Sequence, residues 1–167
     1  MIQLCGLDQV VSALGDPRDY IGPDGVMSPG EMQRWEARLG LVYVSMPGTV
    51  QLSWGRDGQS ARVIRCPELV AESYRHVFAL LHERGIWYRD VHDFGGCLCV
   101  RSQRGAEHLP SLHSWGLAID INVLANPRGQ VGHQSEALIR TFEDAGFLWG
   151  GGFHTPDPMH WQIPRGC

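Results

Sequence analysis

The stretch GLAIDIN, residues 116–122, constrains the fold most, because it predicts a strand with a carboxylate in its middle. Side chains alternate between the two faces of a strand, so Leu117, Ile119 and Ile121 share one apolar face. Asp120 points to the opposite face. A carboxylate in so apolar a strand is costly to bury unless it is paired or binds a metal. The pattern therefore predicts that Asp120 faces a polar cleft while the apolar face meets the core.

A second short strand, MHWQI at residues 159–163, repeats this arrangement with His160 on the polar face. If the two strands are neighbours, His160 meets Asp120 across the sheet. His113 lies seven residues before Asp120, in the expected loop ahead of the first strand, and can reach the same point. Two histidines and one carboxylate, with a fourth position left open, are the ligands of a catalytic zinc site. We therefore expect a metal centre here.

Asp157 stands three residues before His160, in the sequence TPDPMHW. The prolines on either side of it restrict the loop and limit how far its carboxylate can move. Zinc lowers the pKa of a bound water to about 7, so a nearby carboxylate can accept its proton at neutral pH. Asp157 is therefore the candidate general base.

The remaining pattern predicts an α+β fold with a small, largely antiparallel sheet flanked by helices. Helix patterns with plausible caps cover residues 28–40, 67–85 and 135–146. Further strands are expected over 41–54, as two strands around Pro47-Gly48, over 61–66, over 86–91, and over 97–101 after a turn at residues 93–96.

Size and charge exclude several classes of protein. The chain has 167 residues, enough for one compact domain, and a net charge of -4 without a basic stripe, so we expect no nucleic-acid partner. The five cysteines are odd in number and scattered, which is not the pattern of a disulfide framework, so we expect them to be reduced. The N-terminus does not read as a signal peptide, and no apolar run is long enough for stable membrane insertion.

Two blocks of the sequence resemble the M15 metallopeptidases, which include D-alanyl-D-alanine carboxypeptidases and L-alanyl-D-glutamate endopeptidases. SLHSWGLAIDIN, residues 111–122, is similar to the family signature Ser-x-His-x-x-Gly-x-Ala-x-Asp. GFLWGGGFHTPDPMHW, residues 146–161, resembles its second block, Trp-Gly-Gly followed by Asp-x-x-His. The likeness is strongest over residues 97–163 and weaker over the 67–85 helix. Residues 1–40 show none, so we interpret them as an N-terminal extension to a zinc peptidase domain of residues 41–167.

The resemblance implies roles for individual residues. His113, Asp120 and His160 would bind Zn²⁺, and Asp157 would be the catalytic base. An arginine ahead of the first block would touch the substrate or stabilise the developing oxyanion, and we favour Arg101 over Arg104 for this role. Ser111, Trp149 and His154 are further candidates for lining the substrate site. The chain departs from the family after His160, where Gln162 stands in place of a glutamate that many relatives have.

Aspartate at the base position resembles the phage endolysin branch of the family. The resemblance therefore implies a zinc-dependent peptidoglycan peptidase, an endolysin-like L-alanyl-D-glutamate endopeptidase that acts on cell-wall stem peptides as a monomer. Such a protein would be made in the cytoplasm and reach the wall after phage lysis or on a virion. Two alternatives stay open: a D-alanyl-D-alanine carboxypeptidase, and an inactive zinc-stabilised module that only binds peptidoglycan. The intact set of ligands, base and arginine favours an enzyme.

Overall fold

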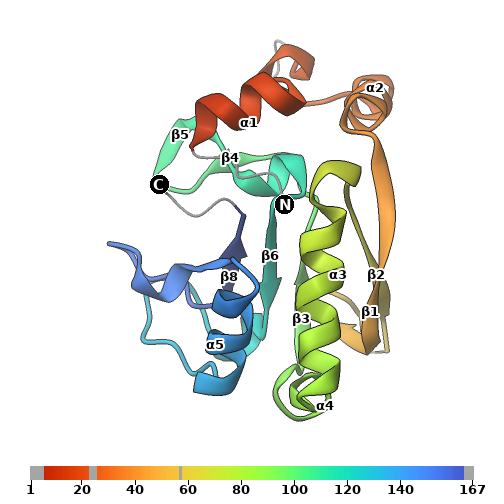
Figure 1. The fold of residues 1–167 in the computed structure, drawn as a ribbon. Coiled ribbons are helices and arrows are strands. Elements are labelled where there is room, and N and C mark those ends of the chain that lie inside the picture. The colour runs from red at the N-terminus through yellow and green to blue at the C-terminus, as the bar shows by residue number, and fades with distance from the viewer. Residues whose placement is uncertain (1–5, 23–25, 57, 164–167) are drawn as a thin grey trace.

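The computed structural model describes residues 6–22, 26–56 and 58–163, and Figure 1 shows how their helices and strands are arranged. The α-helices are α1 (Leu7–Leu14), α2 (Pro29–Leu39), α3 (Glu68–Glu83), α4 (Ile86–Asp90) and α5 (Glu136–Asp144). The 3-10 helices are η1 (Pro17–Tyr20), η2 (Leu112–Trp115), η3 (Val123–Ala125) and η4 (Gly150–Gly152). The strands are β1 (Leu41–Leu52), β2 (Ser60–Pro67), β3 (Asp93–Gly96), β4 (Ser102–Gln103), β5 (Ala106–Pro110), β6 (Ala118–Ile121), β7 (Leu148–Trp149) and β8 (His160–Gln162).

The main sheet has six strands in the order β2-β1-β3-β6-β8-β7, and β4 and β5 form a separate hairpin. All pairs are antiparallel except β1 with β3, which run parallel. The α+β class and the largely antiparallel sheet predicted from the sequence are confirmed, and the one parallel pair makes the sheet a mixed one. Parallel neighbours need a long crossover connection, and the chain between β1 and β3 contains β2, α3 and α4.

The core lies between the sheet and the helices α3 and α5, which cover one face of it (Figure 1). Leu117, Ile119 and Ile121 of the β6 segment are almost completely buried, as the alternating pattern predicted. Trp161 of β8 is also fully buried, and its ring stacks on that of Phe142 from α5 at a centroid distance of 4.3 Å. The opposite face of β6 and β8 is therefore left for polar side chains.

The helix ends follow the sequence signals closely. Ser28 and Glu31 form a reciprocal capping box at the start of α2, and Gly40 ends this helix with a positive φ of 57°. Ser135 caps α5 by accepting a hydrogen bond from the backbone N–H of Leu138. These caps fix the bounds of both predicted helices to within one or two residues.

Three predicted strands are wrong. Residues 41–52 form one strand, not two, and its register shifts between Ser45 and Val50 instead of turning back. Gly48 in this irregular stretch lets the rings of Trp87 and Tyr88 approach, because a Cβ there would lie 3.0–3.1 Å from them. Residues 86–90 are the helix α4 that carries those two rings.

The third error concerns residues 93–101. The expected turn at residues 93–96 is the strand β3, and the expected strand that follows it is irregular chain. This chain hydrogen-bonds to η2 rather than to a strand, because the N–H of Cys99 donates to the carbonyl of His113 and the N–H of Arg101 donates to Oγ of Ser114. The segment therefore supports the loop that carries His113.

The N-terminal residues share the core of the sheet. Val10, Leu14, Trp35 and Leu39 are buried with it. The indole Nε1 of Trp35 donates to the carbonyl of Ser114 at 2.8 Å, and the indole of Trp115 donates to the carbonyl of Gly15 at the same distance. In Figure 1, α1 lies beside the β4–β5 hairpin. No helix in the described part of the chain has the length and apolar character needed to cross a membrane.

Candidate metal centre

The antiparallel register of β6 and β8 places Asp120 directly opposite His160. Their side chains leave the sheet on the face away from the core, so Oδ1 of Asp120 lies 3.1 Å from Nδ1 of His160. Only 8% of His160 is exposed, and 15% of the Asp120 side chain. The two strands thus hold a carboxylate and an imidazole at hydrogen-bond distance in a largely buried position, as the alternation of both segments predicted.

His113 completes the cluster from the 3-10 helix η2. Its Nε2 lies 3.2 Å from Oδ1 of Asp120 and 3.2 Å from Nδ1 of His160. Gly116 ends η2 with a positive φ of 67° and allows the chain to turn directly into β6. A Cβ at Gly116 would lie 3.3 Å from the backbone of Arg65 and Cys66, so this turn is also tightly packed.

The three converging atoms fit a tetrahedral metal ion. Zinc bound at 2.0–2.1 Å by nitrogen and oxygen separates its ligand atoms by about 3.3 Å, close to the edges of the His113, Asp120 and His160 triangle. The distal ring nitrogens support the same reading. Nδ1 of His113 donates to the carbonyl of Cys97 at 2.9 Å, and Nε2 of His160 donates to Oε1 of Gln162 at 3.0 Å. Each imidazole therefore turns an unprotonated nitrogen toward the centre of the triangle.

The charge state of Asp120 suits a ligand. Burial opposes ionisation, but the hydrogen bonds and charges of His113 and His160 outweigh it and hold the pKa of Asp120 well below its ordinary value. The carboxyl is consequently an anion throughout the neutral range, as a ligand of a divalent cation must be.

Asp157 lies on the loop between η4 and β8, and backbone hydrogen bonds hold it there. Its N–H donates to the carbonyl of Gly150 at 2.8 Å, and its own carbonyl accepts from the N–H of His160 at 3.0 Å. Oδ2 lies 3.6 Å from Nε of Arg128, whereas the buried Oδ1 has no hydrogen-bond partner among the described residues. Burial raises the pKa of the Asp157 carboxyl, and the charges of His160 and Arg128 offset this only in part.

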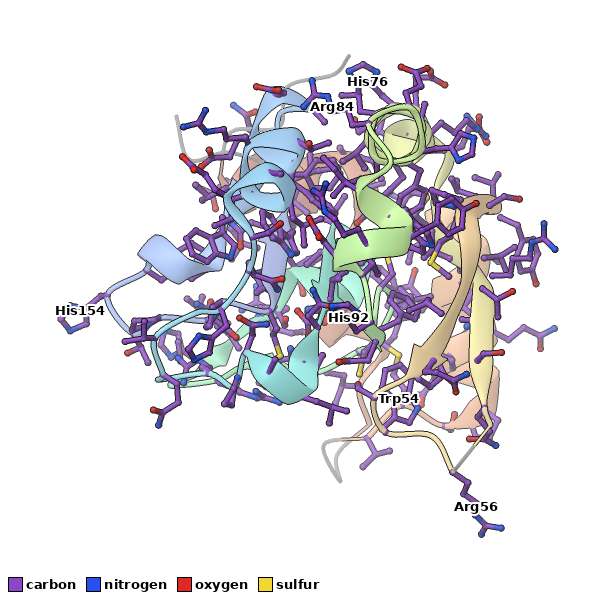
Figure 2. The ribbon with its side chains drawn as sticks, turned by 90° about the horizontal axis from the view of Figure 1, so that it is seen from below. Trp54, Arg56, His76, Arg84, His92 and His154 are labelled. Atoms are coloured by element: carbon purple, nitrogen blue, oxygen red, sulfur yellow. The ribbon has the colours of Figure 1, made fainter. Side chains whose placement is uncertain are left out.

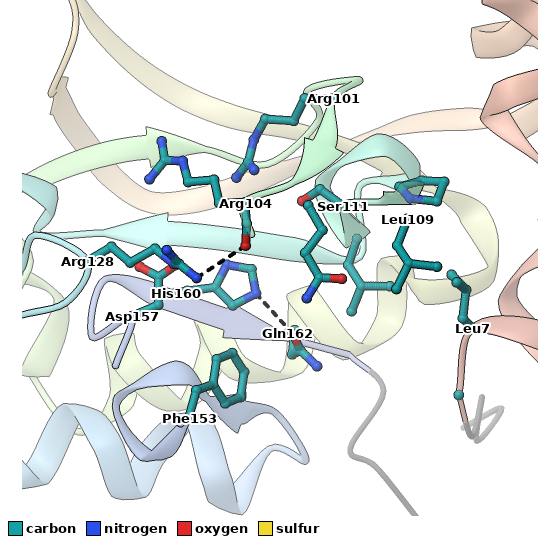
Figure 3. A pocket seen from close by; sticks show the side chains of 14 residues that line it. Leu7, Arg101, Arg104, Leu109, Ser111, Arg128, Phe153, Asp157, His160 and Gln162 are labelled. Atoms are coloured by element: carbon teal, nitrogen blue, oxygen red, sulfur yellow. Dashed lines mark hydrogen bonds and ion pairs between the residues drawn. The ribbon is translucent and has the colours of Figure 1, made fainter. Parts of the chain in front are cut away.

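A pocket of about 290 Å³ opens over His160 and Asp157 and is shown in Figure 3. Arg101, Arg104 and Ser111, three residues predicted to meet the substrate, line it. Ser111 also caps η2 by accepting from the N–H of His113. The other lining residues are Gly6, Leu7, Gln103, Leu109, Pro110, Leu112, Arg128, Phe153 and Gln162.

Two further predicted substrate residues lie outside this lining. His154 is exposed and extends away from the body of the protein in Figure 2. Trp149 packs against the loop between η4 and β8 that carries Asp157, which we call the base loop. Its ring stacks on that of Trp161 with 6.0 Å between centroids, and its Nε1 donates to the carbonyl of Pro158 at 2.8 Å. Its position supports the loop from behind, and its role toward a substrate stays a prediction.

The buried side-chain amide of Gln134, which the sequence did not single out, connects the end of β6, the strand of Asp120, to the base loop. Nε2 of Gln134 donates to the carbonyl of Ile121 at 2.8 Å and to that of Pro158 at 3.1 Å. Its Oε1 accepts from Nδ2 of Asn122, whose backbone has a φ of 57°. Glutamine is usually exposed, so no local pattern could have marked this position.

Arg128 is the second residue that sequence reasoning missed, and it is the one in contact with Asp157. It lies in the loop between η3 and α5, where the sequence NPRGQ indicates only a turn. Nothing in the sequence shows that this turn folds back over the pocket. The N–H of Gly129 ties the turn to the base loop by donating to the carbonyl of Pro156.

Comparison with known proteins supports a peptidase of the M15 group. Residues 104–163 match the M15 family model described as D-alanyl-D-alanine carboxypeptidase. The matched segment contains the three clustered residues His113, Asp120 and His160 together with Asp157. Neither the curated proteins nor the solved structures contain a match to this chain. The family match and the His-Asp-His group together support a metallopeptidase or carboxypeptidase that acts on peptidoglycan.

Proposed function

We propose that the chain is a zinc-dependent peptidoglycan peptidase and that it cleaves the L-alanyl-D-glutamate bond of cell-wall stem peptides. One observation carries the proposal. A triangle of His113, Asp120 and His160 with the spacing of a tetrahedral zinc site lies beside Asp157, whose buried Oδ1 lacks a partner among the described residues. Both features lie at one pocket, where His160 and Asp157 form part of the lining.

The residues of the pocket divide the work of peptide hydrolysis between them. Zinc, when bound, would polarise the scissile carbonyl and lower the pKa of the attacking water. Asp157 accepts the proton of that water and returns it to the leaving nitrogen as the C–N bond breaks. Arg101 stays charged and donates hydrogen bonds to the oxygen on which negative charge develops. His113, Asp120 and His160 would hold the zinc in a fixed position relative to Asp157.

Placement of Asp157 suits this exchange of protons. The raised pKa makes the Asp157 carboxylate a stronger base than an ordinary aspartate, so it accepts the proton of the water more readily. Oδ1, which has no hydrogen-bond partner in the described part of the chain, can accept a hydrogen bond from the attacking water, while Arg128 is beside Oδ2. We expect a single protomer to be active, since every residue used here comes from one chain.

D-alanyl-D-alanine carboxypeptidase activity is the second candidate, because the matching family model carries that description. The same ligands, base and arginine would serve it. The two activities differ in the bond that must reach the metal centre, and therefore in the new ends that appear.

Digestion of purified peptidoglycan by the zinc-loaded chain, with mass spectrometry of the soluble products, tests the proposal. New ends between L-Ala and D-Glu that disappear with a chelator are expected, whereas loss of one terminal alanine would establish the carboxypeptidase. Asp157→Asn should keep its zinc and lose cleavage. Asp144→Asn is the matched control, since Asp144 also pairs with an arginine but does so on the surface. No cleavage of several wall types by the zinc-loaded chain would contradict both activities and favour a binding module.

A further inference from the structure

Arg128 reaches the pocket from the loop that follows η3 and is held beside the candidate base. Its Nε lies 3.6 Å from Oδ2 of Asp157, and its Nη2 donates to the carbonyl of Arg104 at 3.2 Å. Figure 3 shows this guanidinium next to Asp157, at the opposite end of the pocket from Leu7 and Leu109. About 32% of the side chain is exposed, so a ligand in the pocket can touch it.

The pocket is strongly cationic although the chain as a whole carries a net charge of -4. Arg101, Arg104 and Arg128 line it, and Asp157 is the single acidic residue among the lining residues that the structure describes. No hydrogen bond involves Nη1 of Arg128 in the described ranges, so part of its planar fork remains available to a planar anion such as a carboxylate. The excess of positive charge indicates an anionic substrate.

We propose that Arg128 binds the free α-carboxylate of the residue on the leaving side of the scissile bond. This inference rests on the proposed peptidase function. Asp157 must approach the leaving nitrogen in order to protonate it. The α-carboxyl carbon of that residue is about 2.5 Å from the same nitrogen, across the N–Cα and Cα–C bonds. A guanidinium whose Nε is 3.6 Å from the Asp157 carboxylate therefore lies where that α-carboxylate arrives.

Both candidate bonds share this chemistry. In the stem peptide D-Glu continues the chain through its γ-carboxyl, so its α-carboxylate is free when the L-Ala–D-Glu bond is cut. A terminal D-Ala likewise carries a free α-carboxylate. Arg128 then selects for the same group in either reaction, and a stem in which that group is amidated is a poor substrate. At the other end of the pocket, Leu7 and Leu109 form an apolar wall suited to an alanine methyl group (Figure 3).

The test compares acid and amide forms of each substrate. One pair is a stem tripeptide with D-Glu or with its α-amide, D-isoglutamine; the other is a pentapeptide ending in D-Ala-D-Ala or in the corresponding C-terminal amide. The pair that is cleaved identifies the bond. Values of kcat/KM are measured for the zinc-loaded wild type, Arg128→Gln, Arg128→Lys and Arg84→Gln. Arg84 is the matched control, because it pairs with Asp144 outside the pocket.

We expect wild type to prefer the acid by about tenfold or more, the usual value of a charge-assisted hydrogen bond. Arg128→Gln should abolish that preference, Arg128→Lys should restore part of it, and Arg84→Gln should keep it. Any general effect of Arg128 on Asp157 changes both substrates alike, so the acid-to-amide ratio isolates carboxylate recognition. An unchanged ratio in Arg128→Gln overturns the proposal while leaving the peptidase function intact.

Calorimetric titration of the same peptides separates failure of the inference from failure of the function. If wild type cleaves nothing, tighter binding of the acid than of the amide, lost in Arg128→Gln, still supports the carboxylate site. Equal binding of acid and amide, or no binding of either, contradicts it. Zinc content and the unfolding temperature of each variant show that the comparison is made on folded, metal-loaded protein.

Discussion

Asp120 and His160 form a direct cross-strand pair between β6 and β8, with 3.1 Å between Oδ1 and Nδ1. Forty residues separate them in the sequence, yet sheet register alone determines their distance. His113 joins them from a 3-10 helix that is fixed by hydrogen bonds to its neighbours. The candidate site therefore depends on backbone pairing more than on flexible side chains, and it is preorganised for an ion.

Substitution of Asp120 should remove the metal. Wild type is expected to bind zinc stoichiometrically and to gain about 2.7 kcal/mol of unfolding free energy when free zinc is one hundred times its Kd. Asp120→Asn leaves only two imidazoles and should bind little zinc and show little of this gain, by elemental analysis and thermal unfolding. Asp157→Asn should bind zinc as wild type does. Retention of full zinc affinity by Asp120→Asn would contradict the ligand assignment.

Gln162 should tune the affinity of the site without contacting the ion. Its Oε1 accepts a hydrogen bond from Nε2 of His160 and fixes the ring tautomer. Partners of this kind are usually worth about tenfold to hundredfold in metal affinity. We expect Gln162→Leu to weaken zinc binding by that factor in a chelator competition, whereas Gln162→Glu should bind at least as tightly as wild type because a carboxylate makes the imidazole more basic. Equal affinities in all three proteins would show that this hydrogen bond is irrelevant.

Asp157 should lower the stability of the metal-free protein. Its pKa is raised in the fold, so the native environment disfavours the charged form, and Asp157→Asn is expected to raise the unfolding free energy by about 1 kcal/mol at neutral pH. The advantage is full above the raised pKa and disappears below about pH 4, where the carboxyl is protonated in folded and unfolded chains alike. Urea unfolding at several pH values checks the sign, and a less stable Asp157→Asn protein at neutral pH would contradict it.

Two glycines of η4 offer a matched pair of substitutions. A Cβ at Gly150 would lie 2.5 Å from the carbonyl oxygen of Asp157, so Gly150→Ala must displace the base loop. Displacements of about 1 Å at a reacting group can cost about hundredfold in rate, and a loss of that size in kcat/KM is expected. Gly152 has no atom within 4 Å of such a Cβ, so Gly152→Ala should retain activity. Similar rates for the two variants would show that the loop tolerates movement.

The buried amide of Gln134 should stabilise the fold as well as the site. Gln134→Ala removes a donor from the carbonyls of Ile121 and Pro158, of which Pro158 keeps Nε1 of Trp149, at an expected cost of about 2 kcal/mol in urea unfolding. Zinc binding should persist, since no ligand is touched, while kcat falls because Pro158 adjoins Asp157. Gln130→Ala, on the exposed part of the same loop, is the control and should leave both quantities unchanged.

The strands β6 and β8, which carry Asp120 and His160, could be predicted because each places a polar side chain within an otherwise apolar segment. Asp120 interrupts an apolar alternation, and His160 repeats the interruption, so both positions require a partner. The sequence did not predict correctly whether a segment forms a strand or a helix where packing against other elements determines the outcome. Residues 86–90 form α4 because Ile86 and Trp87 are buried there against α3, although their residue types also suit a strand.

Contacts across loops could not be predicted at all. Arg128 approaches Asp157 only because the turn at Gly129 is bonded to the base loop, and Gln134 is buried only because two carbonyls converge on it. A sequence indicates which residue types occur in such turns, but the distance between two turns is set by the whole sheet. The metal ligands were therefore accessible to sequence reasoning, and the residues that position the base were not.

The two indole hydrogen bonds between the N-terminal segment and η2 extend the length of chain that the candidate metal centre depends on. Trp35 and Trp115 cross-link residues 15 and 35 to the segment that carries His113, and Leu7 closes one end of the pocket. Likeness to known peptidases covers residues 104–163, but that stretch lacks β1, β3 and the helix α3 against which its own apolar face packs. The segment that matches the family model is thus shorter than the segment that packs around His113, and a fragment cut to residues 104–163 would lack Trp35 and leave Trp115 without its partner at Gly15.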